Sequence, residues 1–161
     1  MATQYIQFKI GEDDYASEMS LVREIIKPIK VKKLLGAPDF VRGVAKIRED
    51  IIAIIQLHKK FSIQPVTNLE EQGRIIILEI EGEKLGLWVD DVVEILESEM
   101  KEKLPSIIHH GLITEILKVE TLIIPILDVK QLFSSDVSGW LNDGMITPNE
   151  IIKEWQETEN D

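Results

Sequence analysis

The sequence consists of short apolar runs rich in Ile and Val, with charged residues between one run and the next. The runs are YIQFKI, YASEMSLVREII, VRGVAKI, IIAIIQL, RIIILEI, LGLWVDDVVEIL, LITEILKV and LIIPILDV. β-Branched side chains favour the extended backbone, and no long helical pattern separates the runs. Glycine beside acids in IGEDDY and IEGEKL predicts a turn between two strands. We therefore expect a mostly β protein that forms barrels or a sandwich.

The runs recur along the chain in the same order. Residues 5–25 align with 75–95 at an offset of 70, and residues 40–61 align with 112–133 at an offset of 72. Identical residues fall in both windows, although half-buried strands resemble one another in any Ile-rich chain. Because both windows recur in order and at nearly the same spacing, an internal duplication is the favoured interpretation.

Two similar halves, about 5–61 and 75–133, predict two small barrels. A barrel of this size buries little surface on its own, so the two are expected to share an apolar seam. Continuous apolar runs are typical of strands buried on both faces, which favours IIAII and LIIPIL as the strands of that seam. These halves and their surroundings form one predicted domain, residues 1–136.

The remaining residues, 137–161, depart from the repeat. SSDVSGWLNDG reads as a loop, and Thr147, Pro148 and Glu150 have the spacing of a helix cap, its first residue and a capping box. Ile151, Ile152 and Trp155 would share one side of the following amphipathic helix. Such a short helix either docks on the body of the protein or presents its apolar side to a partner.

The net charge of −11 is unevenly distributed. Residues 1–69 carry 11 basic and 8 acidic side chains, whereas residues 70–161 carry 7 basic and 21 acidic ones. This acidic second half argues against binding to nucleic acid. The one basic cluster, KPIKVKK at 27–33, is either a solvated loop edge or an electrostatic docking edge. No signal peptide, membrane-spanning run or cysteine is present, so a cytoplasmic protein without membrane insertion is expected.

The sequence contains no recognisable catalytic constellation. His109 and His110, with Glu102 nearby, are the only suggestion of a metal site, but adjacent residues of an extended segment point in opposite directions. Asp90 and Asp91 are neighbours too, and His58 has no evident partner in the sequence. Asp128 is expected to cap the turn after its strand. We therefore expect no enzyme, no metal and no cofactor, and we favour a binding protein.

Several of these segments resemble the CheW family of bacterial chemotaxis coupling proteins. QYIQFKIGEDDYA is similar to the opening strand–turn–strand of that family, and LVREI to its V-x-E-I. APDFVRGVAKIRE resembles A-P-x-F-(I/V)-x-G-V-x-N-L-R-G, and LGLWVDDVVEIL resembles a further family segment. The resemblance extends from about residue 4 to 133.

This resemblance implies a fold of two interlocked five-stranded SH3-like barrels and a role as a non-enzymatic scaffold. Members of the family connect the cytoplasmic tips of methyl-accepting chemoreceptors to the regulatory domain of a CheA-type histidine kinase, in membrane-associated receptor arrays. The family positions that carry over as partner-binding residues are Val22, Glu24, Gly43, Arg48 and Gly86, and Glu49 lies beside Arg48 in the same turn.

The chain departs from the family at that turn, where N-L-R-G becomes KIRE. Glu49 replaces a glycine, and we expect a side chain there to resist a positive φ and to add a negative charge beside Arg48. A divergent adaptor for a histidine kinase outside chemotaxis is therefore the alternative function.

Overall fold

The structure is a computed structural model, and it describes residues 2–98, 100–104 and 112–134. The elements are β1 (Thr3–Ile10), β2 (Asp13–Glu18), η1 (Met19–Leu21), β3 (Val22–Ile26), β4 (Val41–Ile47), β5 (Asp50–Ile55), α1 (Leu69–Gln72), β6 (Arg74–Ile80), β7 (Glu83–Val89), β8 (Asp91–Ser98), β9 (Lys101–Lys103), β10 (Ile113–Val119), β11 (Leu122–Leu127) and α2 (Val129–Ser134). The predicted mostly β fold is confirmed. The expected C-terminal helix lies outside the described residues.

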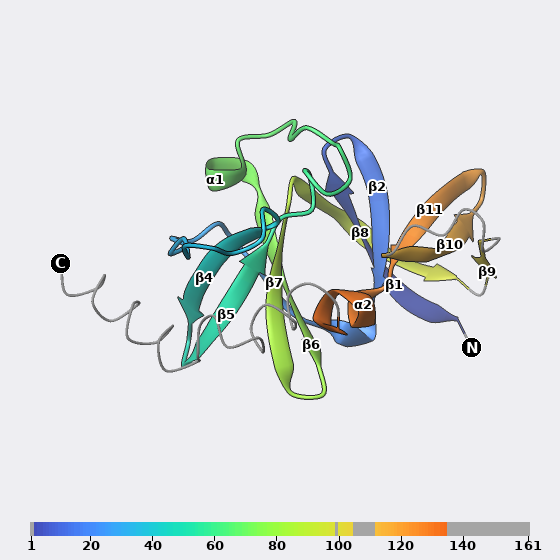
Figure 1. The fold of residues 1–161 in the computed structure, drawn as a ribbon. Coiled ribbons are helices and arrows are strands. Elements are labelled where there is room, and N and C mark those ends of the chain that lie inside the picture. Colours follow the sequence, from blue (N-terminus) through green and yellow to red (C-terminus); the bar gives the residue numbers. More distant parts are fainter. Residues whose placement is uncertain (1, 99, 105–111, 135–161) are drawn as a thin grey trace.

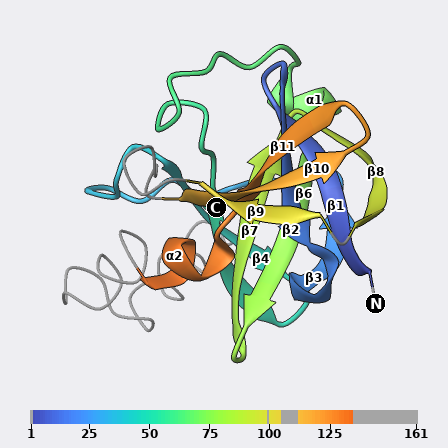
Figure 2. The ribbon, with the colours of Figure 1, turned by 90° about the vertical axis from the view of Figure 1, so that its right-hand side faces the viewer.

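The strands form two sheets that lie side by side (Figure 1). The six-stranded sheet has the order β8-β1-β2-β11-β10-β9 and lies on the right of Figure 1; Figure 2 shows it from the front. The five-stranded sheet has the order β3-β6-β7-β5-β4 and lies on the left. The short α2 follows β11 where the two sheets meet.

The two sheets are copies of one pattern, and each takes strands from both halves of the chain. When β1 to β5 are matched with β6, β7, β8, β10 and β11, the order β8-β1-β2-β11-β10 becomes β3-β6-β7-β5-β4. The parallel pairing also repeats, because Ile54 opposes Gly86 in one sheet and Ile126 opposes Ala16 in the other. The halves therefore exchange strands rather than forming one barrel each.

Local irregularities of the backbone repeat as well. The register shifts between Val41 and Gly43 in β4, and between Ile113 and Glu115 in β10, 72 residues later. The turn after β4 has a left-handed residue at Arg48 (φ 58°), and the turn after β10 has one at Glu120 (φ 55°). Two unlike side chains thus occupy the same backbone conformation, which indicates that the fold imposes it.

Three apolar clusters stabilise the molecule. The largest lies between the sheets and contains residues such as Phe8, Ile76 and Leu87, from β1, β6 and β7. A second cluster surrounds Trp88 and is formed by side chains of the five-stranded sheet and α1. A third surrounds Leu117 and is formed by side chains of the six-stranded sheet. Burial of these side chains is the main force that holds the strands in place.

The seam assigned to IIAII and LIIPIL is only partly right. Ala53, Ile55 and Leu127 belong to the cluster between the sheets, whereas the other buried residues of β5 and β11 belong to the second and third clusters. Leu122 and Ile123 are 53% and 64% exposed because they begin β11 directly after a turn. A run of apolar letters therefore does not guarantee burial at a strand end.

Two of the apolar runs are interrupted in the structure. YASEMSLVREII is divided by η1 into β2 and β3, and LGLWVDDVVEIL is divided at Asp90 into β7 and β8. Asp128 accepts a hydrogen bond from the backbone N–H of Gln131 at 3.3 Å, which confirms the expected cap at the start of α2.

Candidate partner-binding site

The Arg48 side chain forms a two-pronged ion pair with Glu24. Nε of Arg48 donates to Oε1 of Glu24 at 3.2 Å, and Nη2 donates to Oε2 at 2.9 Å. Glu24 lies in β3, at one end of the five-stranded sheet, and Arg48 lies in the turn between β4 and β5, at its other end. The ion pair therefore connects the two edges of the sheet. We refer to Glu24, Arg48 and Glu49 together as the β4–β5 rim.

The rim presents its positive group to solvent. The Arg48 side chain is 77% exposed, whereas that of Glu24 is 29% exposed. The hydrogen bond and charge of Arg48 hold the pKa of the Glu24 carboxyl below its usual value, so the pair is ionised at neutral pH. Arginine has five N–H donors, and Glu24 engages two nitrogen atoms, which leaves donors on the exposed face for an acidic or carbonyl group of a partner.

The sequence led us to expect a strained positive φ at Glu49, and this expectation is wrong, because the positive φ of the turn lies at another residue. Among the described residues other than glycine, positive φ occurs at Arg48, Ser62, Glu81 and Glu120. The left-handed position of this turn is thus Arg48, one residue earlier than expected. Glu49 is exposed beside it, so its effect on a partner would be one of charge rather than of backbone strain.

The other residues carried over from the resemblance lie in strands β3, β4 and β7 of the same sheet. Val22 begins β3 and is half-buried against the cluster between the sheets. Gly43 is buried with φ 142°, and a Cβ atom there would lie 2.0 Å from the carbonyl oxygen of Lys32. Gly86 is buried too, and a Cβ atom would lie 2.7 Å from Cδ1 of Ile54. The two glycines therefore permit close packing inside the protein and offer no side chain to a partner.

The six-stranded sheet differs at the positions equivalent to the ion pair. Glu94 in β8 corresponds to Glu24, and Glu120 corresponds to Arg48, so two exposed acids replace an acid and a base. Val93 and Ile95, on either side of Glu94, are 43% and 55% exposed. The two ends of this duplicated molecule thus offer different chemistry, which would let them select different partners.

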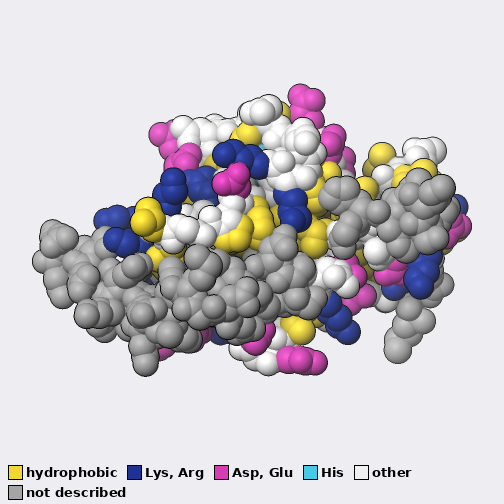
Figure 3. Space-filling view, in the orientation of Figure 1, with side chains coloured by type: hydrophobic (Ala, Val, Ile, Leu, Met, Phe, Trp, Pro, Cys, Tyr) yellow, Lys and Arg dark blue, Asp and Glu magenta, His cyan; other side chains and the backbone are white. Residues whose placement is uncertain are grey.

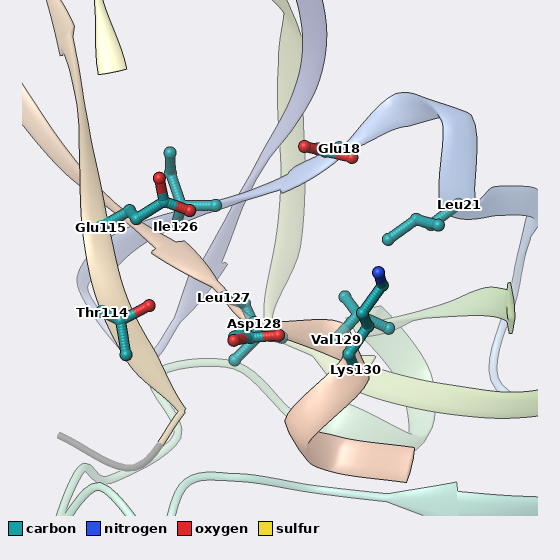
Figure 4. Close-up of a pocket in the computed structure, with 9 residues that line it drawn as sticks. All are labelled: Glu18, Leu21, Thr114, Glu115, Ile126, Leu127, Asp128, Val129 and Lys130. Carbon is teal, nitrogen blue, oxygen red and sulfur yellow. The ribbon is translucent and has the colours of Figure 1, made fainter. Parts of the chain in front are cut away.

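A groove runs between the six-stranded sheet and α2. Figure 4 shows its lining, which comes from β2, η1, β10, β11 and α2. The groove has a volume of about 270 Å³. Glu18, Glu115 and Asp128 make it acidic, Lys130 is its one basic lining residue among the described residues, and Leu21 and Ile126 supply apolar contacts.

A buried histidine–aspartate pair lies at the end of β7. Nε2–H of His58 donates to Oδ1 of Asp90 at 2.5 Å, and both side chains are almost completely buried. His58 therefore has a partner, contrary to the sequence interpretation. Asp90 and Asp91 point in opposite directions as expected, since Asp91 is exposed. The one sequence feature that could have indicated this pair is an acid inside an apolar run, because a buried acid requires hydrogen-bond donors around it.

The Asp90 carboxylate also accepts hydrogen bonds from the backbone N–H groups of Gly11, Val66 and Thr67 and from the hydroxyl of Thr67. Burial alone would raise the pKa of Asp90, but the bonds from His58 and these donors outweigh it and lower the pKa. The pair ties the β1–β2 turn and the segment after β5 to the end of β7. We interpret it as a structural clamp.

Two other expectations bear on the site. His109 and His110 lie outside the described residues, so the metal hypothesis that involves Glu102 stays untested. Across the described ranges, the helices are too short and too polar to cross a membrane.

The chain is similar to known proteins in both sequence and fold. The sequence model of the CheW-like domain matches residues 4–137. A chemotaxis protein CheW from Treponema pallidum is 31% identical over 140 residues, which cover 82% of each chain. The chemotaxis protein CheW of Bacillus subtilis is 27% identical and covers 83% of this chain and 88% of its own. A crystal structure of the scaffolding protein TtCheW from Thermoanaerobacter tengcongensis superposes with a TM-score of 0.72 at 30% identity, covering 79% of this chain and 89% of that one.

Proposed function

The chain belongs to the CheW-like domain family, and we propose that it is a non-enzymatic adaptor that couples chemoreceptors to a CheA-type histidine kinase. It would act in the cytoplasm, at membrane-associated receptor arrays. The observation that carries the proposal is the β4–β5 rim, where two residues expected from the family resemblance form an exposed ion pair.

The rim is proposed to contact the regulatory domain of the kinase. Arg48 is held in one orientation by Glu24, so it loses little further freedom when a partner binds. Its exposed donors suit a carboxylate or carbonyl group on the partner. A charged contact of this kind sets the orientation and the rate of association more than it sets affinity.

The groove beside α2 is proposed to receive the cytoplasmic tip of a chemoreceptor. Receptor tips of the family are helical hairpins, and an amphipathic helix binds well in a groove that offers apolar contacts between polar rims. Leu21 and Ile126 provide such contacts here, and the acids Glu18 and Asp128 would select basic side chains of the receptor.

The substitution Arg48→Glu tests the role of the rim. We expect binding to the kinase regulatory domain or to the receptor tip to weaken roughly tenfold or more, because the change places a like charge in the contact. The far-UV circular dichroism spectrum should be unchanged, since the side chain is largely exposed. For binding to the kinase regulatory domain, Lys103→Glu, an equal charge change on exposed β9, is the matched control. Calorimetry that finds both affinities unchanged would contradict the assigned role.

The double substitution Glu24→Arg with Arg48→Glu separates a direct contact from an internal one. It restores an ion pair of reversed polarity between the same two positions. If Arg48 contacts the partner, the double variant stays weak. Full recovery of both affinities would show instead that the rim serves only to close the sheet.

The alternative is an adaptor for a histidine kinase outside chemotaxis. Glu49 favours it, because this exposed acid stands beside Arg48 where the family has glycine, and it changes the charge that a partner meets. Replacing it by the family residue, Glu49→Gly, should then strengthen binding to a chemotaxis-type kinase domain. An unchanged affinity would remove this support for the alternative.

A further inference from the structure

The five-stranded sheet carries a pocket at the position equivalent to the acidic groove, and its charge is opposite. This pocket has a volume of about 370 Å³ and is lined by Lys33, Asp39, Arg42, Gln56 and Lys59 together with two valines. An offset of 72 residues relates Arg42 to Thr114 and Gln56 to Asp128, both of which line the groove. Duplication has thus produced one acidic and one basic concavity.

The cations of the basic pocket are of two kinds. Arg42 is fixed, because it donates to Gln56 at 2.8 Å and to Glu70 at 2.7 Å and stacks 4.4 Å over the Trp88 ring. Lys33 and Lys59 are exposed, and within the described ranges neither has an acidic partner. The two lysines therefore attract an anionic group, and Asp39 is the only acid among the described residues of the lining to oppose it.

The positive surface extends beyond the pocket. Lys27, Lys30 and Lys32 precede Lys33 in the connection from β3 to β4. Figure 3 shows dark-blue side chains gathered on the left half of the molecule, over the five-stranded sheet. Leu35, two residues after Lys33, is 97% exposed. A segment that combined several carboxylates with apolar side chains would satisfy both features.

The chain itself contains such a segment. Residues 135–161 carry seven acidic side chains and one lysine, a net charge of −6, together with Ile151, Ile152 and Trp155. They follow α2 directly, and 27 residues can extend over about 90 Å, which is ample to reach the other sheet. We propose that the acidic segment 135–161 docks on the basic pocket of its own chain, with carboxylates at Lys33 and Lys59.

This contact would cover the basic surface and leave the acidic groove open. Because it depends on exposed charges, salt would weaken it. A partner with acidic groups would have to compete with the segment for the pocket.

Zero-length cross-linking of the full chain with a carbodiimide, read by mass spectrometry, tests the proposal. We expect Lys33 and Lys59 to be joined to Glu150, Glu154, Glu157 or Glu159 at low salt, and the products to disappear in 1 M salt, where the screening length falls to about 3 Å. Mixing ¹⁵N-labelled and unlabelled chains distinguishes contacts within one chain from those between copies. Links to β9 lysines instead, links only between copies, or none at all would overturn the proposal.

Hydrogen exchange of residues 147–161 gives an independent measure in the full chain. The variant Lys33→Gln with Lys59→Gln should speed exchange there roughly fivefold, because two exposed ion pairs are lost. Lys101→Gln with Lys103→Gln, on the other sheet, is the matched control and should leave the rates unchanged. Equal rates in all three proteins would overturn the proposal.

Discussion

At the scale of single residues, two side chains that are distant in sequence meet to form the rim. The family resemblance pointed to Glu24 and Arg48 separately, but their contact depends on the order of strands in the sheet. No local pattern links residues 24 positions apart. The resemblance therefore identified the two residues, but only the fold shows that they are in contact.

The His58–Asp90 clamp was missed for the same reason. The two residues are 32 positions apart, and the loop residues Val66 and Thr67 that complete the clamp carry no pattern that reveals it. Only the acid in the middle of an apolar run hinted that buried donors were needed. Composition shows that such a requirement exists, but it does not show which residues meet it.

The substitution Asp90→Ala should destabilise the protein strongly. It leaves several buried donors without an acceptor, each of which costs about 1–3 kcal/mol, so we expect a loss of about 3 kcal/mol or more in the free energy of unfolding. The neighbouring Asp91→Ala, at an exposed position, should change it by about 0.5 kcal/mol or less. Urea denaturation measures both, and equal effects would show that the clamp adds no stability.

At the scale of elements, the strands themselves were largely predictable. VRGVAKI and RIIILEI coincide with β4 and β6, because alternating or continuous β-branched residues determine extended structure locally. The divisions at η1 and at Asp90 were not predicted, since the hydrophobic pattern continues through both. Strand β9, with the sequence KEK, lacks any apolar signal and forms by pairing with β10.

Gly43 lies where the segment before β4 packs closely against that strand. Lys32 and Val44 exchange backbone hydrogen bonds at 2.8 and 2.9 Å, which brings the chain before β4 against Gly43. Gly43→Ala should cost about 1–3 kcal/mol through strain and displace this segment. Gly82→Ala, where φ is also positive but nothing lies within 4 Å, should cost only about 1 kcal/mol. If thermal denaturation shows equal losses, the close approach at Gly43 has no energetic consequence.

At the scale of the whole molecule, exchange of strands makes the two halves interdependent. The sequence revealed the duplication, but it did not reveal which sheet each strand joins, because the edges of equivalent strands are interchangeable. The hairpin β1–β2 completes a sheet whose other strands come from the second half. Neither half can therefore satisfy its strand edges alone.

Separate expression of residues 1–69 and 70–161 tests this interdependence. We expect neither fragment to show a cooperative unfolding transition by circular dichroism, because each lacks strands of both sheets. Mixing the two should restore the β spectrum and one transition. A fragment that unfolds cooperatively on its own would refute the claim.

The proposed function is to bring together a histidine kinase and chemoreceptors, with the two ends of the duplicated fold and the groove as distinct contact surfaces. Affinity purification of the full chain from its native cells, followed by mass spectrometry, identifies the proteins that it binds. We expect a CheA-type kinase and chemoreceptors to be recovered together, and Arg48→Glu to reduce recovery of at least one of them. Recovery of a kinase without any receptor, or of neither protein, would contradict it.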